Sequence, residues 1–315
     1  MLWPAVIIAA CSYIPNLNEG FGPIDSRNHR ALSLTFLRFS PSDRVLSNRE
    51  REFSFRVTSA NDFRQVPGLL EDQETERLAF KWKRGFAKGD LEVEVPFLFR
   101  GGGFLDPIIL GWHEHILHWV EPGRAEAPSG RSIVEGPGFS FGSAGGLGDI
   151  SVFWNQRLNG HWSWSSGVKA PTGNAHTLMG SGAFDAGQMM KYVGRLGKGW
   201  SFHGELGLIA QGKPTVLPGG RGLVHQEGMA LTWQPNSRDN WVAQWQAEAS
   251  ALQLGIPGSD ATHRMLVFGY QRRLSNREVL ELCFMEDRDV FNGRWPEGAN
   301  IAPDFSIQAG ITLRY

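Results

Sequence analysis

The residues best suited to metal chemistry lie together in residues 101–120, GGGFLDPIILGWHEHILHWV. His113, Glu114, His115 and His118 form a polar run there. A zinc protease needs two histidines one helical turn apart, in the pattern H-E-x-x-H. The spacing here is H-E-x-x-x-H, which misses that geometry by one residue. We therefore interpret the run as the polar face of a helix and assign neither a metal nor a cofactor.

Serine chemistry has little more support. Residues 138–142, GFSFG, match G-x-S-x-G around Ser140, but that motif needs a helix after its turn, and a Gly-rich loop follows here. Ser181, His176 and Asp185 could be drawn as a triad, yet three such residues within ten positions of a polar loop are expected by chance. No catalytic residue is assigned.

The run around His113 belongs to a predicted amphipathic helix. Pro107 suits its first turn, and Asp106 is the expected N-cap. The surrounding sequence predicts strands, so the helix must lie in a loop between two of them. Its apolar positions recur at helical spacing and are Leu105, Ile108, Ile109, Trp112, Ile116 and Trp119.

The strand pattern is clearest in residues 304–315, where apolar and polar residues alternate up to Tyr315. This period of two places all the apolar side chains on one face. About ten residues is also the length of a tilted transmembrane β-strand. We predict an all-β fold, a closed antiparallel barrel of outer-membrane type, because closure satisfies the backbone groups that lipid cannot. The apolar positions are Phe305, Ile307, Ala309, Ile311, Leu313 and Tyr315.

The composition agrees with a barrel. Hydrophobic residues make up 41% of the 315 residues, and no apolar run reaches the ~18 residues of a spanning helix. A net charge of -1 without a basic cluster argues against a nucleic-acid partner. The 12 Trp and 20 Phe suit aromatic girdles at the membrane interfaces. Two cysteines, Cys11 and Cys283, give no disulfide framework.

Short and long connections alternate between the predicted strands, as periplasmic turns and extracellular loops do in outer-membrane barrels. The longer connections include 61–73, 100–147 and 288–303. Residues 31–40 also look strand-like, but an even number is needed to place both termini in the periplasm. The twelve predicted strands are 51–60, 74–84, 90–99, 148–158, 161–171, 184–195, 200–211, 223–234, 240–252, 263–273, 277–287 and 304–315.

The chain therefore divides into residues 1–50 and a barrel of residues 51–315. Residues 1–11 resemble the remnant of an export signal, in which Cys11 follows a lipobox-like sequence. The rest of residues 1–50 is expected to be a lead-in or a plug in the lumen.

Successive side chains of a strand point to opposite faces, so the sequence assigns a lipid face and a lumen face to most of the strands. Strands 223–234 and 263–273 are ambiguous.

Inward charged residues on neighbouring strands could form ion pairs. Across one short turn, Lys83 could pair with Glu92 and Lys81 with Glu94. The predicted helix could narrow the barrel mouth or lie on its rim. The candidates for lining the lumen or a constriction are Arg77, Lys81, Glu92, Glu94, Asp106, His113, Glu114, Asp149, Lys169 and Asp185. Of these, Lys169 and Asp185 could form a structural ion pair or line a constriction.

Five stretches resemble, in order, the landmarks of an uncharacterised bacterial family, domain of unknown function 3187. They are residues 72–77, 102–114, 171–185, 286–287 and 302–306. Residues 148–149 and 169–173 are also similar to outer-membrane transporters linked to aromatic-compound degradation. The resemblance implies a Gram-negative outer-membrane barrel whose first strand begins near Arg51, and it supplies no catalytic residues. Gln73 and residues 115–118 depart from the family pattern, which affects the shape of the loop but not the fold.

We expect a narrow passive pore or transporter for small solutes in the outer membrane. The alternatives are a lipid-modifying enzyme and a plugged barrel with a structural or surface-interaction role. The expected partners are outer-membrane lipid and the barrel-assembly machinery, which would recognise the C-terminal strand ending at Tyr315.

Overall fold

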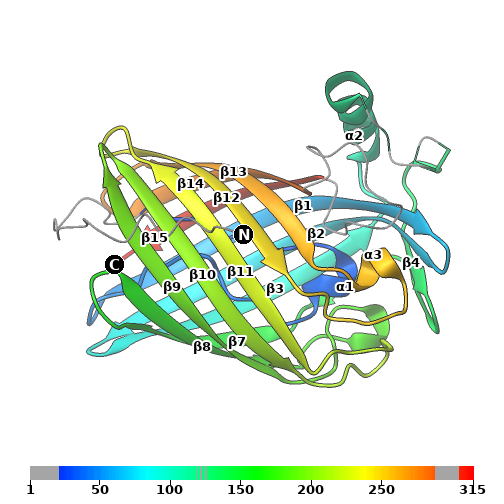
Figure 1. Ribbon diagram of the computed structural model, residues 1–315, viewed down its shortest axis with the longest axis horizontal. Helices are drawn as coiled ribbons and strands as arrows, with labels where there is room; N and C mark the ends of the chain where they lie inside the picture. Colours follow the sequence, from blue (N-terminus) through cyan, green and yellow to red (C-terminus); the bar gives the residue numbers. More distant parts are fainter. Residues whose placement is uncertain (1–20, 119, 121–122, 125, 288–304) are drawn as a thin grey trace, which may run out of the picture.

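Twelve antiparallel strands form a closed barrel wall (Figure 1). The computed structural model describes residues 21–118, 120, 123–124, 126–287 and 305–315. Strands β1 and β15 pair from Glu52 opposite Arg314 to Asn61 opposite Phe305, which closes the sheet and confirms the predicted fold. The wall strands are β1 (Arg51–Val66), β2 (Leu69–Phe86), β3 (Gly89–Gly101), β7 (Ile150–Arg157), β8 (Trp162–Ala170), β9 (Asp185–Gly197), β10 (Trp200–Gln211), β11 (Leu223–Trp233), β12 (Asp239–Glu248), β13 (His263–Arg273), β14 (Glu278–Asp287) and β15 (Phe305–Arg314).

The two ends of the barrel differ. Tyr315 and most of the short turns lie at one end, which we call the turn end. The longer connections and the β1–β2 turn lie at the other, the loop end (Figure 1). No helix among the described residues is both long and apolar enough to cross a bilayer. The elements outside the wall are α1 (Ala31–Leu34), α2 (Asp106–Trp112), the π-helix η1 (His113–Leu117), β4 (Ile133–Gly136), β5 (Phe139–Phe141), β6 (Ala144–Leu147), the 3-10 helix η2 (Ala175–Thr177) and α3 (Pro257–Asp260).

Alternation along each strand sends apolar side chains outward and polar ones inward. On β1, Phe53 and Val57 are exposed on the outer face, whereas Arg56 and Thr58 are buried on the inner face. Strands β11 and β13, whose sequences are ambiguous, also alternate between the two faces, but part of the inner face of β13 is apolar. Phe268 of β13 is exposed, whereas its neighbour Val267 is fully buried in an apolar cluster with Ile24. The outer face is therefore apolar, as a membrane-facing surface requires.

One predicted connection is wrong. Residues 61–73 do not form a long loop. β1 continues to Val66, β2 begins at Leu69, and a two-residue turn joins them. Apolar alternation stops near Asn61, but the pairing of backbone groups does not depend on it. The hairpin tip is instead covered by other parts of the chain, so polar residues on both of its faces are buried.

Residues 21–50, which we call the luminal segment, pass through the barrel interior and turn back. Phe21 lies at the turn end, where the guanidinium of Arg273 is 5.2 Å from its ring. At the loop end, Arg30 binds Glu71, close to the β1–β2 tip. The segment then returns, and the backbone N–H of Leu46 donates to Asp90 at the start of β3. The luminal segment thus has an ascending limb (21–30), an apex at α1 and a descending limb (35–50).

The apex is packed in an apolar core at the loop end, with α1 inside the barrel outline (Figure 1). Residues 31–40 form no strand, because α1 and the extended chain after it bury their side chains against the connections instead. This core, which we call the cap, contains Ala31, Leu32, Phe36, Leu69, Val134, Phe139, Phe141, Leu178, Leu217, Ala251, Leu252 and Ile256.

Gly269 of β13 offers a test of how closely the luminal segment packs against the wall. A Cβ atom there would lie 2.5 Å from Ile24 Cγ1. We predict that Gly269→Val weakens docking of the segment by about 1–3 kcal/mol through overpacking. Because cleavage tracks the undocked population, trypsin should cut after Arg27 or Arg38 roughly tenfold faster or more.

The matched control is Gly222→Val, since a Cβ atom at Gly222 would meet nothing within 4 Å. Equal cleavage rates in the two variants would contradict this packing.

Candidate functional site

The ascending limb is held by amide side chains of the wall. Gln244 of β12 accepts a hydrogen bond from the Ile24 backbone N–H (2.9 Å) and donates to the Ile24 carbonyl oxygen (3.2 Å). Ser26 donates to the next inward residue, Gln246, at 2.9 Å. Glutamines two positions apart on a strand face the same way. The two side chains of β12 therefore provide hydrogen bonds that a neighbouring strand would otherwise give to the limb.

The descending limb binds strands β9 and β11, on the same side of the wall as β12. Asp185 of β9 accepts from the Leu37 backbone N–H at 2.9 Å, and Gln226 of β11 both accepts from and donates to the backbone of Phe39. Nearer the turn end, the Lys191 ammonium donates to the Ser42 carbonyl oxygen at 2.7 Å. Wall side chains therefore satisfy backbone groups that no sheet pairs.

Two wall strands and the ascending limb share a charged cluster. Lys81 Nζ lies 3.1 Å from Glu92, 3.0 Å from Glu94 and 2.8 Å from Asp25 of the luminal segment. Arg77 also pairs with Glu94, and Lys83 Nζ is 3.5 Å from Glu92. The two ion pairs expected from the sequence are thus both present. Asp25, which the sequence did not single out, adds a third carboxylate.

Asp25 belongs to the luminal segment and to no membrane-spanning strand. Burial alone would raise the pKa of its carboxyl group, but the ammonium of Lys81 and the guanidinium of Arg56, 3.0 Å away, outweigh burial. The pKa of Asp25 is therefore held well below its usual range, and the carboxylate stays charged. The ascending limb thus carries a fixed negative charge that is paired with Lys81 and Arg56 of the wall.

Lys169 is the centre of a second buried network. Its ammonium lies 2.6 Å from Asp149, 2.6 Å from Ser181 Oγ and 3.4 Å from Asp185. Asp149 also accepts from the backbone N–H groups of Gly173 and Ser181. The predicted meeting of Lys169 and Asp185 is therefore present. Through Ser181 this network binds a connection, and through Asp185 it binds the luminal segment at Leu37. It therefore links the wall to both.

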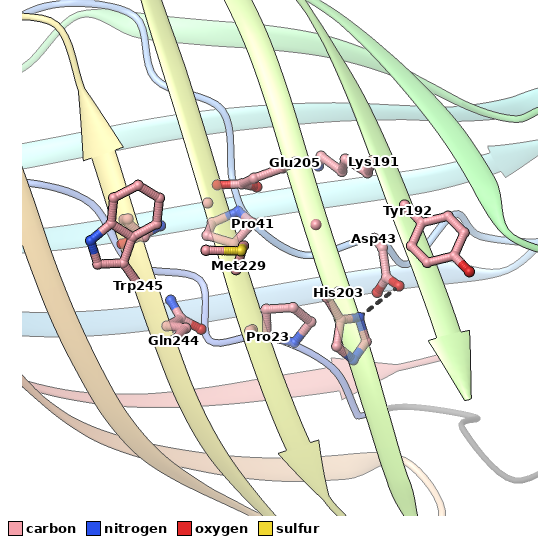
Figure 2. Close-up of a pocket in the computed structure, with 14 residues that line it drawn as sticks. Pro23, Pro41, Asp43, Lys191, Tyr192, His203, Glu205, Met229, Gln244 and Trp245 are labelled. Carbon is pink, nitrogen blue, oxygen red and sulfur yellow. Dashed lines mark hydrogen bonds and ion pairs between the residues drawn. The ribbon is translucent and has the colours of Figure 1, made fainter. Parts of the chain in front are cut away.

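A small space separates the two limbs near the turn end (Figure 2). Pro23 of the ascending limb and Pro41 of the descending limb both line it, and Asp43 is 3.1 Å from Nδ1 of His203. Its volume is about 10 Å³, room for roughly one water molecule. A second space of about 20 Å³ follows nearer the loop end, between Arg27, Arg38 and Gln246. Both spaces lie between the limbs and the same side of the wall.

The predicted helix does not enter the barrel mouth. α2 begins at Asp106 with Leu105 as its N-cap, so Asp106 is not the cap. Its carboxylate accepts instead from Asn61 on the outer face of β1. The ring of Trp112 packs 5.9 Å from that of Phe284, an outward residue of β14. Asp106, His113 and Glu114 therefore lie outside the wall and line no constriction. The cap and the luminal segment already fill the space inside.

The serine candidates are placed away from any catalytic arrangement. Ser140 is exposed on β5, in a hairpin with β4 rather than before a helix. Ser181 is bound by Lys169, and within the described ranges no hydrogen bond joins it to His176. The described residues also contain no cluster of His, Cys, Asp and Glu suited to a metal ion. Cys11, Trp119 and the connection 288–303 lie outside the described residues.

Comparison with known proteins agrees with this geometry. The family described as "Protein of unknown function (DUF3187)" matches residues 2–315. The COG4313 outer membrane channel from Pseudomonas putida F1 is similar in fold, with a TM-score of 0.54 and 12% identity over 86% of this chain and 97% of that one.

Two further structures are more distant. The Ralstonia pickettii toluene transporter TbuX has a TM-score of 0.43 and 10% identity over 96% of this chain and 99% of that one. The KdgM porin has a TM-score of 0.43 and 7% identity over 83% and 98%. No curated protein matches the chain. The likeness to the Pseudomonas channel shows the outer-membrane barrel fold.

The buried pair at the apex tests how firmly the luminal segment is held. Arg30 Nε lies 2.7 Å from Glu71 Oε2, and both side chains are almost fully buried. We predict that Arg30→Met costs about 3–5 kcal/mol, because it leaves the Glu71 carboxylate buried without its partner. The midpoint of heat-induced unfolding, followed by gel mobility, should fall.

The double variant Arg30→Met/Glu71→Met should recover much of the lost stability, because it removes both charges. If the double variant is less stable than Arg30→Met alone, the pair is not what holds the apex.

Proposed function

The chain belongs to the DUF3187 family, and we propose that it is an outer-membrane channel for small polar solutes that the luminal segment holds closed. Barrels of about eight strands are filled by their own side chains, whereas barrels of 16–18 strands enclose a water-filled channel. A barrel of twelve strands lies between these sizes. The interior here is occupied by a segment that is not part of the wall.

The observation that carries the proposal is how this segment is bound. Its backbone is held by side-chain hydrogen bonds from wall residues such as Gln244, Asp185 and Gln226, and it contributes no strand to the sheet. A segment held in this way can leave without breaking the barrel. The wall behind it is rich in charged and amide groups, which suits small polar solutes.

The cap is the natural gate of this channel. At the loop end the route is closed by the apolar core around α1, whereas ionisable side chains such as Asp43, Lys191 and Glu205 help to line the space between the limbs. We propose that opening separates α1 from the connections above it. We further propose that the turn end and both termini face the periplasm, and that the barrel-assembly machinery recognises the strand ending at Tyr315.

A plugged barrel with a structural or surface-interaction role is the second candidate. It is favoured by the two spaces between the limbs, which hold about one water molecule each. The two candidates differ in whether the segment ever leaves. Nothing in the placement of Ser140 or Ser181 favours the lipid-modifying enzyme.

Conductance across planar lipid bilayers distinguishes these candidates. Arg38 pairs with Glu248 of β12, and both side chains are buried. We predict that Arg38→Gln raises the open probability roughly 100-fold, because undocking then costs about 3 kcal/mol less. The matched control is Arg272→Gln, which breaks an ion pair with Asp239 on the exposed outer side of the turn end.

A second variant lacks residues 22–45 and keeps β1 intact. It should conduct continuously. If this variant and Arg38→Gln both migrate as folded barrels but carry no current, the protein is not a channel.

A further inference from the structure

An exposed apolar stripe runs along the segment that projects from the barrel at the loop end. Phe104, Ile108 and Ile116 are 64%, 55% and 58% exposed. Ile108 of α2 and Ile116 of η1 are eight residues apart, which keeps them on nearly one side, and Phe104 lies two residues before α2 begins. Leu105 and Ile109, one position further round the helix, are buried. The helix therefore has a wider apolar arc than the protein itself covers.

The segment is fixed to the outer face of the wall. Glu74 of β2 accepts from the backbone N–H groups of Phe104 (3.0 Å) and Leu105 (2.7 Å). Beyond Trp112, the Phe284 ring lies 5.1 Å from that of Phe305. Figure 1 shows α2 outside the barrel, beside the loop-end portion of the wall. These contacts hold the exposed stripe in a set position.

Two grooves lie between this segment and the wall. One, of about 510 Å³, is lined by Ile108, Trp112, Ile116, Phe284 and Phe305. The other, of about 870 Å³, begins at Phe104 and follows outward side chains of the wall that include Val57, Phe268, Leu282 and Ile307. The second groove is continuous with the face that the barrel turns to the membrane.

This continuity identifies what covers the stripe. The outward band of β1 and β2 is apolar from Phe53 to Val57 and from Trp82 to Leu78. Towards the loop end it gives way to Ser59 and Glu76, which are hydrogen-bonded to each other. Phe104 lines the groove at that same level, together with Ser59 and Glu76. The stripe therefore begins where acyl chains give way to headgroups.

We propose that residues 104–116 are an interfacial anchor and that acyl chains of membrane lipid fill the grooves between this anchor and the wall. An amphipathic helix with one apolar face lies in the plane of the interface in this way. Glu114 is exposed on the other side, where water and headgroups accept its charge. The site binds a hydrocarbon chain and has no preference for a headgroup built into it.

Site-specific fluorescence in lipid vesicles tests the proposal. A Cys11→Ser background leaves only the buried Cys283. Ile116→Cys and the matched control Glu114→Cys each receive one environment-sensitive fluorophore. The vesicles contain phosphatidylcholine with a quenching nitroxide on its acyl chain. The label at position 116 should be quenched at least threefold more by the lipid nitroxide than the label at 114, and aqueous iodide should give the reverse order.

Two results would overturn the proposal. Iodide could quench position 116 as strongly as position 114, which would place the stripe in water. Position 116 could also be shielded from both quenchers, which would mean that protein covers it. Neither result bears on conductance, so this test is independent of the proposed channel.

Discussion

The structure depends on pairing charges that the barrel cannot satisfy with its wall alone. Neighbouring strands bring Lys81, Glu92 and Glu94 together, and the luminal segment adds Asp25 to that group. A buried charge without a partner is costly, and Asp25 finds its cationic partners, Lys81 and Arg56, on the wall. The same holds at the loop end, where Arg30 of the segment meets Glu71 of the wall. The interior is thus one electrostatic unit made from two parts of the chain.

Polar contacts hold the limbs in the shaft, where Ile24 and Phe39 also pack in apolar clusters with wall residues, and apolar contacts dominate at the loop end. In the shaft, individual side chains of the wall hold the backbone of each limb, and each such hydrogen bond contributes only about 0.5–1.5 kcal/mol. At the loop end, α1 is buried in a continuous apolar core that draws on most of the long connections. The cap therefore closes the barrel, while the shaft fixes the register of the limbs.

Much of the wall could be predicted from sequence, because parity and turn length leave few alternatives. Strands β10 and β13 have the predicted bounds, and the two predicted lysine–glutamate pairings are present. These features depend on neighbours in one sheet, and register follows from a short turn. The prediction failed at the β1–β2 tip, where both strand faces are polar because other parts of the chain cover them.

The luminal contacts could not be predicted in the same way. Arg38 and Glu248 are 210 positions apart, and nothing in either local sequence indicates the other. The helix was expected from its spacing, but its side of the wall depends on what already fills the mouth. Asp106 illustrates this, since its carboxylate meets Asn61 outside the wall instead of lining the lumen. Periodicity predicts an element and its faces, and only the assembled interior decides which face is covered.

The most direct test of the account is a disulfide between the luminal segment and the wall in intact outer membranes. A Cβ atom at position 269 would lie 2.5 Å from Ile24 Cγ1, which suits the short Cβ–Cβ separation of a disulfide. The variant is Ile24→Cys/Gly269→Cys in a Cys11→Ser/Cys283→Ala background, and Ser54→Cys/Thr312→Cys across the β1–β15 closure is the control. We predict that both pairs cross-link under mild oxidation. Cross-linking of the control pair alone would mean that residues 21–50 do not lie inside the barrel.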